Sequence, residues 1–88
     1  MTKSQQKLIN SILADKDVKQ LNLKELLEAI VASQKSVVKG DKLASKIFKA
    51  PPRTCQTWRL GERLPRPKKA MEIIKIMNGV ITLDGVYN

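Results

Sequence analysis

The chain has 88 residues, in which 17 Lys and Arg oppose eight Asp and Glu for a formal charge of +9. This length accommodates one small domain with a modest core. Because only three residues are aromatic, that core must consist mainly of aliphatic side chains, which favours packed helices over stacked sheets. A single cysteine and the lack of histidine exclude an internal disulfide framework and the usual zinc-ligand spacing.

Membrane and secretion signals are also missing from the sequence. No stretch approaches the roughly 18 apolar residues that cross a bilayer, and the first residues lack the apolar segment of a signal peptide. We therefore expect a cytoplasmic protein with no membrane partner. We also find no motif for a cofactor, a metal or a small-molecule substrate.

The positive charge is concentrated in the middle of the chain. Residues 39–69 contain ten basic and two acidic residues, whereas residues 1–38 contain six and four, and residues 70–88 contain one and two. Solubility alone does not require such segregation. A basic segment of this kind is typical of proteins that bind a polyanion, although an ordinary solvated surface is the alternative.

Two amphipathic segments precede the basic one. Residues 4–14 carry apolar side chains at helical spacing, with Ser4 as the expected N-cap. A second helix is predicted from Leu23, and an Asn at position 22 followed by Glu25 resembles a capping box. Its apolar pattern continues through the two valines at 37 and 38, and we expect Gly40 to end the helix.

Two short helices joined by a tight turn are predicted next. The first covers residues 42–48, with Asp41 as its N-cap. Pro51 and Pro52 cannot lie in the middle of a helix but suit a first turn, so the second helix should run from one of them to about Leu60. This pair has the parts of a helix-turn-helix, in which one helix braces another that enters the major groove.

The remainder of the chain is also expected to be helical. A rigid connector with prolines at 65 and 67 leads to a helix over residues 67–77, which Gly79 closes. Residues 80–88 should form a short turn capped by Thr82. The sequence thus predicts one all-α domain, a small bundle of about five helices.

Several short motifs follow one another in a fixed order along this part of the chain. They are Leu43-Ala44, Thr54-Cys55-Gln56-Thr57-Trp58, Gly61-Glu62-Arg63 with Pro65, then Ala70, Ile73, Ile74, Gly79 and Thr82. Together they resemble the phage Cro and repressor type of helix-turn-helix regulator, over roughly residues 23–87. The chain departs from that family in the turn, where Phe48 and Lys49 replace a usual glycine, and in its two prolines.

The resemblance implies a function and an organisation. It implies sequence-specific binding of double-stranded DNA by a homodimeric transcriptional regulator, a repressor of phage, plasmid or mobile-element type. Residues 1–22 would be a helical extension, 23–79 the helix-turn-helix core and 80–88 a tail. The alternatives are a DNA-architectural accessory protein of recombination or conjugation, and an antitoxin-like protein-interaction module. We do not expect an enzyme, because the chain has no His and its carboxylates are scattered.

Candidate DNA contacts are the polar side chains in and around the second short helix. Arg53, Gln56 and Thr57 are the predicted base contacts, since Arg can pair with guanine and Gln with adenine. The predicted backbone contacts are Lys42, Lys49, Arg59, Arg63, Arg66, Lys68 and Lys69. A solvated surface is the alternative for each of them. Cys55 and Trp58 are predicted to be buried, rather than to act as a redox sensor or to stack on DNA.

Overall fold

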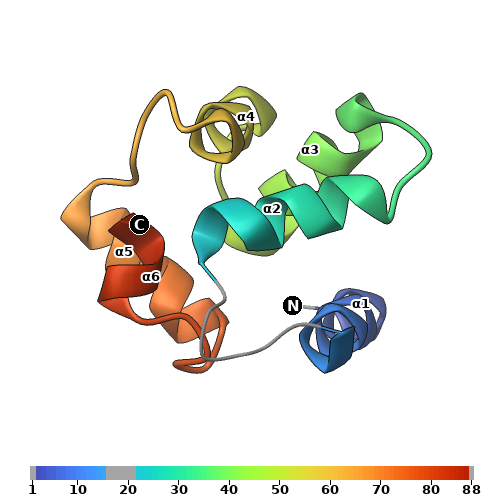
Figure 1. The fold of residues 1–88 in the computed structure, drawn as a ribbon, viewed down its shortest axis with the longest axis horizontal. Coiled ribbons are helices and arrows are strands. Elements are labelled where there is room, and N and C mark those ends of the chain that lie inside the picture. Colours follow the sequence, from blue (N-terminus) through green and yellow to red (C-terminus); the bar gives the residue numbers. More distant parts are fainter. Residues whose placement is uncertain (1, 16–21, 88) are drawn as a thin grey trace.

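A computed structural model describes residues 2–15 and 22–87, and all the regular structure in these ranges is helical. In chain order the helices are α1 (Lys3–Asp15), α2 (Leu23–Ala32), α3 (Val37–Phe48), α4 (Pro52–Leu60), α5 (Pro67–Ile76) and α6 (Leu83–Tyr87) (Figure 1). The all-α prediction is therefore confirmed, with the tail forming a helix of its own. In the described ranges, every helix is too short or too polar to cross a membrane.

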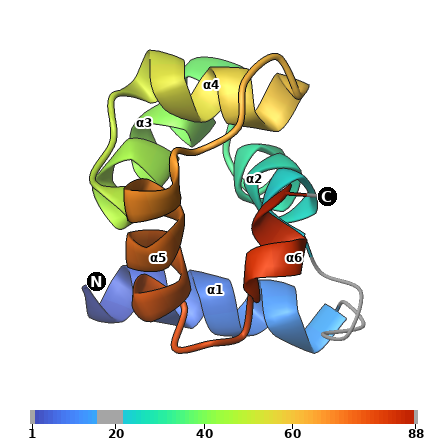
Figure 2. The same cartoon turned by 90° about the vertical axis from the view of Figure 1, so that its left-hand side faces the viewer.

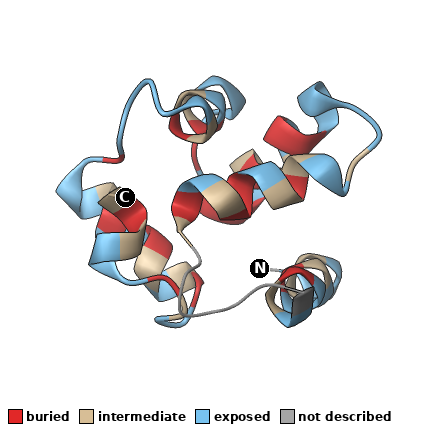
Figure 3. Ribbon diagram, viewed as in Figure 1, coloured by how far each residue is buried: buried red, intermediate tan, exposed pale blue. Residues whose placement is uncertain are grey.

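Helix α2 is the central element of the fold. It packs against α3 and α4 and also contacts α1 and α6, while α5 packs against α3 and α6. In both views α4 lies at one end of the molecule and α1 at the opposite end (Figure 2). Buried residues lie on the parts of the helices that face the interior, whereas the residues on the outer side of α4 are exposed (Figure 3).

Side-chain caps fix where the first two helices begin. Thr2, rather than the predicted Ser4, caps α1: its Oγ1 accepts a hydrogen bond from Gln5 N at 3.2 Å, and Gln5 Oε1 accepts one from Thr2 N at 3.0 Å. This reciprocal pair is a capping box. For α2 the predicted cap is confirmed, since Asn22 Oδ1 accepts a hydrogen bond from Glu25 N at 2.8 Å.

The boundary between α2 and α3 differs from the sequence prediction. The chain leaves α2 at Ser33, and Ser36 caps α3 by accepting a hydrogen bond from Lys39 N at 3.2 Å. Gly40, the predicted helix end, lies inside α3 and is buried, as is Asp41, the predicted N-cap. The serine caps therefore determine the boundary. The valines at 37 and 38, which the sequence pattern assigns to the preceding helix, begin α3 and are 50% and 64% exposed.

Gly40 is needed at its position because α3 crosses α2 there at close range. A Cβ atom at Gly40 would lie 2.6 Å from the Cα of Val31 and 2.8 Å from its Cγ2. Since the nearest atom belongs to the backbone of α2, a side-chain rotation alone cannot relieve the clash. The glycine is thus a site of helix–helix approach rather than a helix end.

The turn between α3 and α4 is made by a lysine in a glycine-like conformation. Lys49 is the C-cap of α3 with φ 55° and ψ 44°, which is the left-handed region. Pro52, one of the two prolines predicted to start the next helix, opens α4. Gly61, with φ 77°, ends α4, and Thr82 Oγ1 caps α6 by accepting a hydrogen bond from Gly85 N.

Gly40→Ala should destabilise the fold. The added methyl group meets the α2 backbone, and overpacking of this kind costs about 1–3 kcal/mol, against a gain of about 1 kcal/mol in helix propensity. The net loss of stability should therefore reach about 2 kcal/mol. Urea unfolding followed by Trp58 fluorescence would measure the change. Lys39→Ala, at an exposed position of the same helix, is the control and should leave the midpoint nearly unchanged. Equal midpoints for the two variants would contradict the close approach.

Candidate nucleic-acid interface

Helix α4 is held on the body of the protein by the side chains beneath it. Cys55 and Trp58 are buried in the common core, as predicted. Burial raises the pKa of the Cys55 thiol to about 11, with the nearby Asp41 carboxylate as a second cause. The thiol is therefore protonated at neutral pH and acts as a small apolar side chain. With its inner side anchored in this way, α4 presents its other side to solvent.

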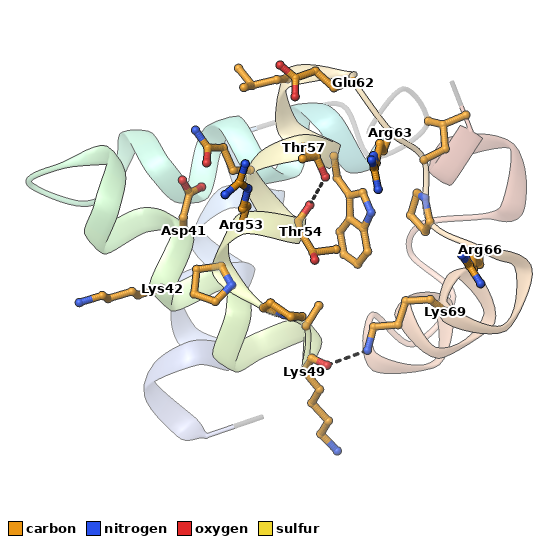
Figure 4. A pocket seen from close by; sticks show the side chains of 18 of the residues that line it. Asp41, Lys42, Lys49, Arg53, Thr54, Thr57, Glu62, Arg63, Arg66 and Lys69 are labelled. Carbon is orange, nitrogen blue, oxygen red and sulfur yellow. Dashed lines mark hydrogen bonds between the residues drawn. The ribbon is translucent and has the colours of Figure 1, made fainter.

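An open groove runs along the exposed side of α4 (Figure 4). Residues from α3, the turn, α4, the connector that follows it and the first turn of α5 line this groove. It brings together eight of the ten predicted DNA contacts, namely Arg53, Gln56, Thr57, Lys42, Lys49, Arg63, Arg66 and Lys69. The two acidic residues that line it are Asp41 and Glu62, so the surface carries a clear excess of positive charge.

The three predicted base contacts differ in their freedom to bind. Arg53 and Gln56 are exposed on α4, and no hydrogen bond within the described residues involves either side chain. The Thr57 hydroxyl donates a hydrogen bond to Thr54 O at 2.7 Å, one turn back in the helix. Toward a ligand, Thr57 therefore offers its remaining oxygen lone pairs rather than its proton.

Arg59 does not line this groove and is paired inside the protein. Its Nε donates to Asp41 Oδ1 at 3.3 Å and its Nη2 donates to Asp41 Oδ2 at 3.2 Å. The two side chains are only 13% and 11% exposed. This bidentate pair joins α4 to α3 across 18 positions of sequence, and it gives Asp41 a role that the sequence analysis missed.

Lys69 makes internal contacts as well. Its Nζ donates to the Lys49 carbonyl at 2.9 Å and to Glu72 Oε2 at 2.8 Å, so it ties α5 to the turn that precedes α4. The hydrogen bond from Lys69, together with its charge, lowers the pKa of the Glu72 carboxyl. Lys68 is exposed at the start of α5 but is not among the residues that line the groove.

Breaking the pair between Asp41 and Arg59 should weaken the fold strongly. Asp41→Ala leaves a mostly buried guanidinium without its partner, which should lower the free energy of unfolding by about 3 kcal/mol. Changing both residues to Ala should cost less than the sum of the two single changes. The control is Glu72→Ala, which removes a partner from the exposed contact with Lys69 and should leave the urea midpoint nearly unchanged. Strictly additive single changes would show that the pair does not couple α3 to α4.

The chain was also compared with known proteins. No protein-family model matches it, and neither the curated proteins nor the solved structures contain a match.

Proposed function

We propose that the protein binds double-stranded DNA by placing α4 in the major groove. The observation that carries this proposal is the exposed side of α4, where Arg53 and Gln56 point to solvent in a groove with an excess of positive charge. A major groove about 12 Å wide admits one α-helix, and these two side-chain types read guanine and adenine edges. Helix α3 and the left-handed turn at Lys49 hold α4 in the manner of a helix-turn-helix.

The cations around α4 suit the two phosphate backbones that border a major groove. Lys42 comes from α3, whereas Arg63 and Arg66 come from the connector on the other side of α4 in Figure 4. Contacts of this kind position a protein on the duplex but carry no sequence information directly. Arg59 and Lys69 are engaged within the protein, so we assign them to holding α4 and its turn in place.

The alternative of a protein-interaction module has less support. It would use the apolar sides of the N-terminal helices, but Ile9 and Ile12 of α1 and Leu26 and Ile30 of α2 are buried in the protein's own core. Within DNA binding, we favour a homodimeric regulator over a recombination accessory protein because of the family resemblance. Genomic sites that overlap promoters would distinguish the regulator from the accessory protein.

Binding to duplex DNA should weaken steeply as salt increases. Five exposed cations, Lys42, Lys49, Arg63, Arg66 and Lys68, are in place to neutralise phosphates. Five phosphate contacts give a slope of about −4.5 in a plot of log affinity against log salt concentration, and a dimer should give about twice that value. Titrations of a fluorescent duplex at several salt concentrations would measure the slope. A nearly flat response would argue against an electrostatic interface.

Arg53 and Lys68 should differ in their effects on specificity. Arg53 lies in the first turn of α4, where a guanidinium can form two fixed hydrogen bonds to guanine. Arg53→Ala should therefore weaken the specific site by about 1–3 kcal/mol and change random DNA little. Lys68→Ala should weaken both DNAs about equally and reduce the salt slope by about 1.

This comparison requires two titrations for each variant, one with the specific duplex and one with the same bases scrambled. If Arg53→Ala weakened both duplexes to the same extent, Arg53 would be a phosphate contact. The assignment of α4 as the base-reading helix would then be wrong.

A further inference from the structure

The connector between α4 and α5 carries two of the proposed phosphate contacts. Arg63 and Arg66 are both exposed and both line the groove beside α4. Prolines at 65 and 67 flank Arg66, and neither has an N–H group with which the backbone could form a hydrogen bond. Backbone hydrogen bonds hold the two ends of the segment, since Arg63 N donates to Thr57 O at 3.4 Å and Arg66 O accepts from Ala70 N at 2.8 Å. The middle of the segment, at Leu64 and Pro65, therefore depends on contacts from the rest of the protein.

One side chain from the end of the described chain reaches the connector. The hydroxyl of Tyr87 donates a hydrogen bond to the carbonyl oxygen of Pro65 at 3.0 Å, across 22 positions of sequence. Among the described residues, no other side-chain hydrogen bond ends on residues 64–66. Pro65 lies between Arg63 and Arg66, directly before Arg66, and is itself buried, so this contact fixes the segment between the two arginines.

Tyr87 is well placed to act as an anchor. It is half-buried and packs against the core, and its neighbour Val86 is buried in the same helix. Helix α6 in turn contacts both α2 and α5. The Tyr87 hydroxyl thus links the connector, through α6, to the central helix α2.

We propose that Tyr87 is a positioning residue that holds Arg63 and Arg66 in the geometry required for contact with DNA phosphates. The inference rests on the proposed function. A segment that is already ordered in the free protein loses less conformational entropy when DNA binds, so affinity is higher. Lys69 has the corresponding role before the N-terminal end of α4, where its Nζ donates a hydrogen bond to the Lys49 carbonyl. The α5–α6 pair therefore fixes the backbone on both sides of α4.

Tyr87→Phe tests this role because it removes only the hydroxyl group. Loss of one hydrogen bond that orders the connector should weaken DNA binding by about three- to tenfold. The loss should be the same for specific and scrambled duplexes, since phosphate contacts carry no sequence information directly. In the free protein, NMR order parameters of the Arg63 and Arg66 amides should fall, while those within α4 should not change.

A double-mutant cycle separates positioning from a general effect on stability. In a variant with both Arg63→Ala and Arg66→Ala, Tyr87→Phe should have no further effect on DNA affinity, because the cations that it positions are gone. In a Lys42→Ala background, which leaves the connector intact, the full three- to tenfold loss should persist. Binding is measured in urea-free buffer, after unfolding curves have shown that every variant is folded.

The outcomes separate this inference from the proposed function. If the unaltered protein binds no duplex DNA, the proposed function fails and the role of Tyr87 fails with it. If the unaltered protein binds with a steep salt dependence but Tyr87→Phe weakens binding equally in both backgrounds, DNA binding stands and the positioning role is overturned. Unchanged order parameters at Arg63 and Arg66 would overturn it as well.

Discussion

The close crossing of α3 over α2 at Gly40 determines where the exposed side of α4 points. With no side chain at Gly40, α3 lies directly against the backbone at Val31. The next residue, Asp41, is then buried at the contact between α3 and α4, where it meets Arg59. Because Cys55 and Trp58 are buried on the inner side of α4 and Arg59 is held at the edge of that side, Arg53 and Gln56 lie on the exposed side. A single helix–helix approach thus orients the proposed reading surface.

Part of the basic charge maintains the structure rather than facing a ligand. Arg59 neutralises a buried carboxylate, and Lys69 holds a backbone carbonyl and Glu72. Neither role can be seen from a count of charges along the sequence. Apart from Arg53 on α4, the exposed cations proposed to contact DNA come from α3, the turn, the connector and the start of α5, and so they flank α4. In the proposed complex with DNA, this arrangement places most of the phosphate contacts beside α4 and the base contacts on the helix itself.

Residue types that favour helix ends predict both ends of α4 correctly, but they do not predict where α3 begins. Prolines restrict where a helix begins, and Gly61 can adopt the left-handed conformation that ends one, so both ends of α4 are encoded locally. Gly40 follows an apolar run, which is typical of a helix end, but its role depends on contact with Val31 of another helix. The Asp41–Arg59 and Tyr87–Pro65 contacts join residues 18 and 22 positions apart, so no local pattern predicts them.

The burial of Cys55 gives the protein an internal reporter of its own motions. The thiol lies beneath α4, and its raised pKa leaves very little thiolate at neutral pH, so an alkylating reagent can react only when α4 lifts away from the core. Since Cys55 is the single cysteine of the chain, the rate of labelling would report the opening of one helix without any engineered probe. Local opening of this kind occurs at lower free energy than global unfolding, and a ligand that clamps α4 in place would slow the labelling.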